Sequence, residues 1–253
     1  MSPYDGIKGA SSEFPQSTGH FERYDSCGDT KSAFAPDYEF REQLKKGELA
    51  EQIFMLFMEQ RKQLKKICNW KDVRKNPSYQ DIDVDFIYID KRGKEIRCEV
   101  KNDSYSSGNL FAEQLVTHYT EDREGNILQA STALGWAHKS KADKIFYFFE
   151  KSSVAYFIDR KQFNAWVDWV LSNRNLKSEN RTFHVTPFQS RSALNYPSRH
   201  ENPSCEVKSY YYGVGYLVPT KDIVSAPRLK NHLWVLKVED YNLNTGEIKT
   251  RLK

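Results

Sequence analysis

Two short segments carry acidic and basic side chains, and a charged stretch that contains a glycine joins them. The segments at 83–90 (DVDFIYID) and 95–101 (EIRCEVK) are rich in β-branched and aromatic residues, so together they predict a β-hairpin. Side chains two apart on a strand share a face, and Glu99 and Lys101 therefore point the same way. The hairpin also brings Asp85 close to both of them.

Carboxylates beside a lysine ammonium are the groups that a Mg²⁺-dependent phosphodiesterase needs. Carboxylate oxygens of Asp85 and Glu99 suit Mg²⁺, which keeps several waters and completes its shell with substrate phosphate oxygens. The metal lowers the pKa of a bound water, and the ammonium of Lys101 would orient that water and offset charge in the transition state. Asp85 is preferred because the apolar run 86–89 begins directly after it, and Asp83 is the alternative.

A helix is expected ahead of the hairpin, from about residue 38 to residue 67. Apolar residues recur in this range near helical spacing. Glu48 and Glu51 are three residues apart and face roughly the same side, so the helix could direct either one toward the metal. The alternative for each is a solvated partner of a nearby lysine or arginine. Glu51 is the preferred third ligand.

Glu51, Asp85 and the tripeptide from Glu99 to Lys101 (EVK) resemble the motifs of the PD-(D/E)XK, or restriction-endonuclease-like, nuclease superfamily. The resemblance covers about residues 38–172 and rests on the order and predicted secondary structure of these residues. It implies an α/β fold with a four-stranded mixed sheet flanked by helices. The sequence departs from the family pattern in having no proline before Asp85. The simpler interpretation of the EVK tripeptide is a surface ion pair on a strand.

The resemblance implies a metal-dependent DNA endonuclease that hydrolyses phosphodiester bonds. Asp85, Glu99 and Glu51 would bind Mg²⁺, for which Mn²⁺ could substitute, and Lys101 would be catalytic. Alternatives are a site-specific restriction-type endonuclease, a junction resolvase, or a non-catalytic DNA-binding or assembly protein on the same fold. DNA is the expected partner, and a homodimer is an option that the sequence leaves open.

The sequence after the hairpin predicts further elements from its apolar patterns and turn residues. They are a loop at 104–109, a helix at 110–119, a polar loop at 120–126, a short helix at 131–141, strands at 144–150 and 154–158, and a helix at 160–171. Aromatic residues recur at helical spacing in the last helix, so they are expected in the core.

Basic and polar residues flank the predicted site. Lys139, Lys141 and Lys144 could contact DNA phosphates without reading the base sequence, although a lysine cluster is commonly a solvated face. Asn109 and Glu113 are further candidates for approaching the metal. The tyrosines of the C-terminal third, Tyr210, Tyr211, Tyr212 and Tyr216, could stack on nucleic acid, but packing in a half-buried sheet is favoured.

Length and composition fit one large domain with appendages. The chain has 253 residues and a formal net charge of +4, which is compatible with nucleic-acid binding. Residues 1–35 predict an irregular N-terminal arm, residues 36–175 the nuclease core, and residues 176–253 a β-rich extension. The strand candidates in that extension are 182–185, 209–218 and 232–238.

Two classes of protein have no support in the sequence. The four cysteines show no CxxC pair and no zinc-ligand spacing, which argues against a disulfide scaffold or a zinc domain. No long apolar run is present, so neither a membrane helix nor a secretory signal is expected. The protein is therefore expected in the cytoplasm, with no membrane partner.

Overall fold

The computed structural model describes residues 36–105, 107–121, 127–173, 183–194 and 208–252. The predicted arm at 1–35 and most of the predicted loop at 120–126 lie outside the described residues. Within the described part of the chain, no helix is both long enough and apolar enough to cross a membrane.

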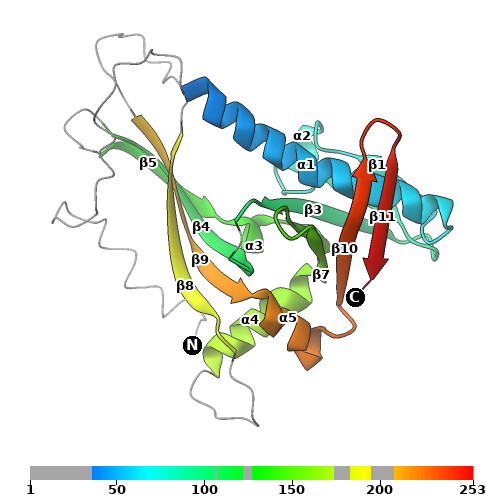
Figure 1. Cartoon of the computed structure of the whole chain (residues 1–253). Helices are drawn as coiled ribbons and strands as arrows, with labels where there is room; N and C mark the ends of the chain where they lie inside the picture. The colour runs from blue at the N-terminus through cyan, green and yellow to red at the C-terminus, as the bar shows by residue number, and fades with distance from the viewer. Residues whose placement is uncertain (1–35, 106, 122–126, 174–182, 195–207, 253) are drawn as a thin grey trace. The chain divides into compact units, whose positions relative to one another are not determined.

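A seven-stranded mixed sheet carries the predicted hairpin (Figure 1). Strand β3 pairs with β6 in parallel, and every other pair of neighbours is antiparallel. In spatial order the strands are β1 (Asn69–Asp72), β2 (Phe86–Ile89), β3 (Glu95–Asp103), β6 (Lys144–Phe149), β7 (Val154–Asp159), β10 (Leu233–Asn242) and β11 (Glu247–Leu252).

The predicted hairpin is confirmed. Strands β2 and β3 are antiparallel, with Phe86 opposite Cys98. Gly93 in the connecting turn has a φ of +79°, a left-handed conformation that glycine adopts without a steric penalty. Asp90 stabilises the turn, since its carboxylate accepts hydrogen bonds from the backbone N–H groups of Arg92 and Lys94.

Helix α1 (Pro36–Gln63) covers one face of this sheet (Figure 1). It ends four residues before the predicted boundary at 67, so Leu64 of the expected apolar stripe follows the helix and is exposed, whereas the stripe from Ala50 to Met58 is buried as expected. Alternate residues of each strand point to this face, which buries their side chains against the helix. The cluster includes Ala50, Ile53, Phe54, Phe57 and Met58 from α1, and Phe86, Cys98, Val100, Phe146 and Phe157 from the sheet.

Helix α4 (Arg160–Ser172) lies on the other face and confirms the prediction for 160–171. Its Phe163, Trp166, Val167 and Val170 are buried core residues. They pack with the alternate residues of β6 and with two short elements near the C-terminus, helix α5 (Thr220–Ser225) and the 3₁₀ helix η1 (Pro227–Leu229).

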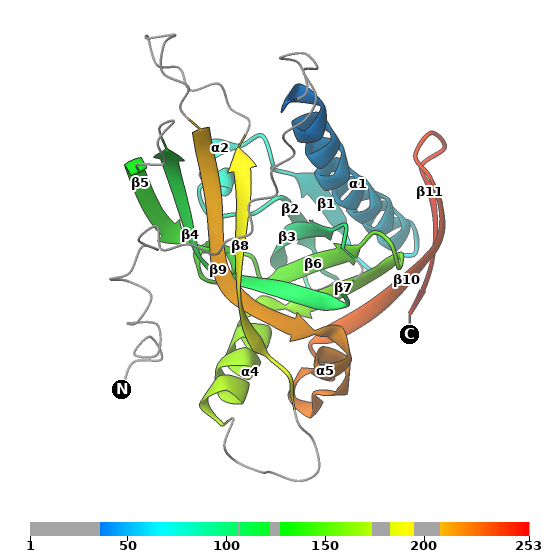
Figure 2. The same ribbon diagram turned by 60° about the vertical axis from the view of Figure 1, so that its left-hand side comes forward.

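A second, four-stranded antiparallel sheet joins two strands of the predicted β-rich extension to two strands from the region before it (Figure 2). In spatial order its strands are β5 (Ile127–Leu134), β4 (Asn109–Glu121), β9 (Lys208–Pro219) and β8 (Thr186–Leu194). The predicted helix at 110–119 is wrong, because these residues form β4 and pair with β9. The predicted helix at 131–141 is also wrong in its first part, because only Trp136–Lys139 are helical, as α3. At 110–119, pairing with a distant strand outweighs the local preference for a helix.

The C-terminal third contributes strands to both sheets. The predicted strands at 209–218 and 232–238 are confirmed as β9, which pairs with β4, and β10, which pairs with β7. The third candidate, 182–185, precedes the observed strand β8, which begins at Thr186. Another short helix, α2 (Pro77–Gln80), lies between β1 and β2.

Candidate functional site

The hairpin brings together three of the predicted site residues. Lys101 Nζ lies 2.6 Å from Glu99 Oε1 on the same face of β3. Asp85 stands directly before β2, where its backbone N–H donates to the Cys98 carbonyl oxygen at 2.9 Å. Asp85 Oδ2 accepts a hydrogen bond of 2.8 Å from the Val100 N–H, which fixes the carboxylate against the strand that carries Glu99 and Lys101.

Two of these side chains, Glu99 and Lys101, lie on the sheet face opposite α1. Cys98 and Val100 are buried against α1, and the alternation of β3 sends Glu99 and Lys101 to the other side. Across the parallel pair, Glu99 stands opposite Ile145 of β6 and Lys101 stands opposite Tyr147. Both β6 residues belong to the buried core, so buried side chains flank Glu99 and Lys101 on this side.

Glu99 is a buried carboxylate with an unsatisfied oxygen. Its side chain is only 6% exposed. The pKa of Glu99 is raised to about 8, mainly by burial; the charge of Lys101 lowers it in part, and the charge of Asp85 raises it. Glu99 Oε2 has no hydrogen-bond partner among the described residues. A buried acceptor without a partner is unfavourable, so this oxygen needs a proton, a water or a cation to satisfy it.

The charge of Lys101 is stabilised by the carboxylates around it. Burial alone lowers the pKa of Lys101, but Glu99, Asp85 and Asp83 together outweigh this effect and raise it. Burial also raises the pKa of Asp85, against the Val100 N–H and the charge of Lys101. Lys101 therefore remains an ammonium at neutral pH. It contacts Glu99, a carboxyl group with a raised pKa.

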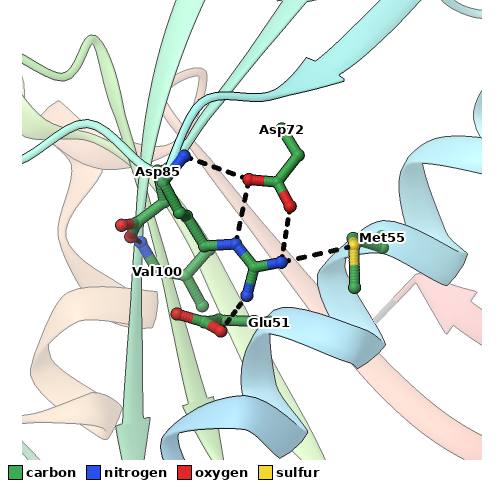
Figure 3. A network of polar contacts seen from close by, with 6 residues as sticks. Glu51, Met55, Asp72, Asp85 and Val100 are labelled. Atoms are coloured by element: carbon green, nitrogen blue, oxygen red, sulfur yellow. Dashed lines mark hydrogen bonds and ion pairs between the residues drawn. The ribbon is translucent and has the colours of Figure 1, made fainter. Parts of the chain in front are cut away.

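Glu51 does not join this group directly, because Arg74 engages its carboxylate (Figure 3). The Arg74 guanidinium also binds Asp72, with Nη2 at 2.5 Å from Oδ2 and Nε at 3.0 Å from Oδ1. Burial raises the pKa of Glu51, Arg74 lowers it, and the charge of Asp85 raises it again, so Glu51 lies within electrostatic range of the hairpin. Glu48, the alternative on the same helix, is exposed.

Arg74 was missed in the sequence, where it is one of several basic residues at 71–75. Its guanidinium lies 4.9 Å from the centre of the Phe86 ring, between the helix that carries Glu51 and the strand that follows Asp85. No local pattern distinguishes it from its neighbours. The only indication is the carboxylate of Asp72 two residues earlier, which also accepts a hydrogen bond from the Arg74 backbone N–H.

Replacing Arg74 by methionine is expected to lower the free energy of unfolding by about 1–3 kcal/mol. The substitution keeps an unbranched apolar side chain but leaves Glu51, whose side chain is 25% exposed, without its cation. The double variant Glu51→Gln/Arg74→Met removes the less exposed of the two carboxylates that lose their cation, and it is expected to regain most of the lost stability. Urea unfolding of the wild type and the variants measures both effects, and equal losses in the single and double variants would contradict this account.

The predicted phosphate-binding lysines do not form one cluster. Lys139 Nζ lies 2.8 Å from Asp83 Oδ1, and Asp83 in turn influences the pKa values of Glu99 and Lys101, so Lys139 lies at the border of the site. Lys144 lies 3.5 Å from Asp159 and is paired in register with Cys98, whose side chain faces α1. The side chain of Lys141 is exposed. Phosphate contact stays a prediction for all three.

Glu113 comes close to the site from the second sheet. It is buried on β4, accepts a hydrogen bond from the Tyr211 hydroxyl, and accepts another from the Trp136 backbone N–H. Burial raises the pKa of Glu113, and the charge of Lys101 lowers it. Asn109 and Glu113 were the two further candidates for approaching the metal. Glu113 lies within electrostatic range of Lys101. Asn109 is the first residue of β4.

The described residues contain no group of three or more His, Cys, Asp or Glu side chains arranged to hold a metal ion. Glu99 contacts Lys101, and Glu51 contacts Arg74, so the three predicted ligands are not gathered around one point. The donor chemistry nevertheless fits Mg²⁺, because Asp85 and Glu99 are hard oxygen donors and Glu99 keeps a buried oxygen without a partner.

Comparisons of the chain with models of protein families, with curated proteins and with solved structures found no match. The site is defined by its own side chains: two carboxylates, Asp85 and Glu99, beside the ammonium of Lys101.

Proposed function

We propose that the protein is a Mg²⁺-dependent deoxyribonuclease of the PD-(D/E)XK type, which hydrolyses phosphodiester bonds in DNA. The observation that carries the proposal is Glu99 Oε2, a buried carboxylate oxygen without a hydrogen-bond partner among the described residues. It belongs to a side chain in contact with an ammonium and near a second carboxylate, Asp85. A hard divalent cation would satisfy this oxygen and relieve the repulsion between the two carboxylates.

The order of elements also supports the proposal. Helix α1 carries Glu51, β2 follows Asp85, and β3 carries Glu99 and Lys101 within a mixed sheet. This is the order that the resemblance to the PD-(D/E)XK superfamily implies. The connection from β3 to the parallel strand β6 differs from the expected helical one, because it contains β4, β5 and α3.

Each residue would have a distinct role. Asp85 and Glu99 would hold the metal, which supplies a water of lowered pKa and neutralises phosphate charge. The Val100 N–H keeps the Asp85 carboxylate in place. The Lys101 ammonium would orient the attacking water and stabilise the negative charge that develops on the phosphate. Glu51 would serve as a third ligand once its carboxylate leaves Arg74.

Cleavage assays on labelled single-stranded, duplex and branched DNA test the proposal, with Mg²⁺, Mn²⁺ or EDTA. Metal-dependent cutting is expected for the wild type and for Glu95→Gln, which alters an exposed residue of the same strand. Glu99→Gln keeps the shape of the side chain but removes the charge that binds the metal, so it is expected to lose cutting. Bound but uncut DNA in the wild type would instead favour a non-catalytic DNA-binding protein.

The same assay is expected to depend on pH when the metal is limiting. The pKa of Glu99 is raised to about 8, so a proton competes with the metal for its carboxylate near neutral pH. The apparent metal affinity, and with it the cleavage rate, should rise with pH up to about 8 and then level off. Saturating Mg²⁺ should weaken this dependence. A rate that falls over this range at limiting metal would contradict the assignment of Glu99.

A further inference from the structure

Strand β4 of the second sheet is anchored next to Lys101. Tyr147 stands directly opposite Lys101 in the pairing of β6 with β3. Its hydroxyl accepts a hydrogen bond of 3.2 Å from the Phe111 N–H of β4 and donates one of 3.2 Å to Asp103 of β3. Strand β4 therefore lies against the sheet face that carries Lys101. Glu113, two residues after Phe111, continues along the same strand.

The backbone around Glu113 is held in a tightly packed position. The pairing of β4 with β9 shifts register between Glu113 and Leu115, a bulge of the kind that redirects a side chain. Two glycines approach this point so closely that neither has room for a side chain. A Cβ on Gly215 would lie 2.3 Å from the Ala112 carbonyl oxygen, and one on Gly135 would lie 2.5 Å from the Glu113 carbonyl oxygen.

The carboxylate of Glu113 is fixed as firmly as its backbone. The residue is 8% exposed, and its carboxylate accepts hydrogen bonds from the Tyr211 hydroxyl and the Trp136 N–H. A neutral side chain could join β4 to β9 without the cost of burying a charge. The cation that lowers the pKa of Glu113 is Lys101, so the buried charge has a partner in the site.

We propose that Glu113 is a positioning residue for Lys101, with Tyr211 holding the Glu113 carboxylate in place. The Lys101 ammonium has three donors, and Glu99 Oε1 at 2.6 Å takes one of them. Strand β4 is tied to Tyr147, the residue opposite Lys101, and the charge of Glu113 on this strand would attract the ammonium and hold it between the two sheets. The inference rests on the proposed nuclease function, in which the orientation of this ammonium sets the rate.

The kinetic test uses two conservative substitutions. Glu113→Gln keeps the shape and an acceptor oxygen but removes the charge, and it is expected to lower kcat by about 10- to 100-fold with KM for DNA unchanged. Tyr211→Phe removes one hydroxyl and should change kcat in the same direction by less. Tyr212→Phe is the matched control, since the next residue along β9 points to the opposite face of the sheet. A purely structural role for Glu113 predicts a lowered unfolding midpoint with kcat per folded molecule unchanged.

A second readout does not depend on cleavage. The ¹H–¹⁵N spectrum of lysine ammonium groups reports Lys101 directly, with its signal assigned by its loss in Lys101→Met. Glu113→Gln is expected to shift or broaden this signal, and Tyr212→Phe is expected to leave it unchanged. An unchanged signal and unchanged kcat in Glu113→Gln would overturn the inference while leaving the nuclease proposal intact. A shifted signal in a protein that cuts no DNA would uphold the positioning role of Glu113 and reject the nuclease.

Discussion

Replacement of Lys101 by alanine is expected to reduce the rate of Mg²⁺-dependent DNA cleavage by about 10²–10³-fold. The Lys101 ammonium is held 2.6 Å from Glu99, and the surrounding carboxylates raise its pKa, so it is charged and oriented before substrate arrives. In the proposed reaction its charge matters most as negative charge develops on the phosphate. DNA affinity should change little, because an interaction made mainly in the transition state affects rate more than ground-state binding.

Single-turnover cleavage at saturating Mg²⁺, together with DNA binding in Ca²⁺, separates these two effects. Saturating metal is needed because Lys101→Ala also removes the cation that lowers the pKa of Glu99. Lys161→Ala, which alters an exposed residue of α4, is the matched control and should retain the wild-type rate. Equal rates for the wild type and Lys101→Ala would remove Lys101 from the mechanism.

The hairpin of the site could be predicted because the residues that define it are close together in the sequence. The two strands are adjacent in sequence, the turn contains Gly93 in a left-handed conformation, and the period of two places Glu99 and Lys101 on one face. Asp85 could be placed because it precedes a short, largely buried strand, and its hydrogen bond to the Val100 N–H ties it to β3. Its preference over Asp83 as a metal ligand stays a prediction.

The second sheet could not be predicted because its pairing is long-range. Strand β4 has apolar residues at spacings that also suit a helix, and its central partner β9 lies about a hundred residues later in the chain, as in the contact between Glu113 and Tyr211. Loop closure over such a distance leaves no local signal. The sequence therefore named Glu113 and Tyr211 separately but gave no reason to connect them.

The sequence also could not predict which charged side chains form ion pairs with each other. Glu51 was predicted to be a metal ligand, and the structure pairs it with Arg74, a residue with no distinctive local pattern. Such pairs depend on how a helix docks on the sheet, not on spacing along the chain. The docking of α1 therefore determines whether Glu51 can reach Asp85, and the aromatic cluster beneath the helix fixes that docking.

Truncation of Phe54 to alanine is expected to lower the free energy of unfolding by about 3–5 kcal/mol. The side chain is fully buried, and its ring centre lies 4.8 Å from that of Phe86 and 5.1 Å from that of Phe146. The substitution leaves a cavity between α1 and the sheet and removes the aromatic contacts of Phe54 with Phe86, Phe146 and Phe157. Urea unfolding, followed by circular dichroism, measures the change.

Leu64→Ala is the matched control for this prediction. Leu64 directly follows α1 and is 61% exposed, so its truncation is expected to change the free energy of unfolding by less than about 0.5 kcal/mol. A loss in Phe54→Ala as small as that expected for Leu64→Ala would show that the packing of α1 on the sheet contributes little to stability. The support that this packing gives to Glu51 and Arg74 would then have to come from the ion pair itself.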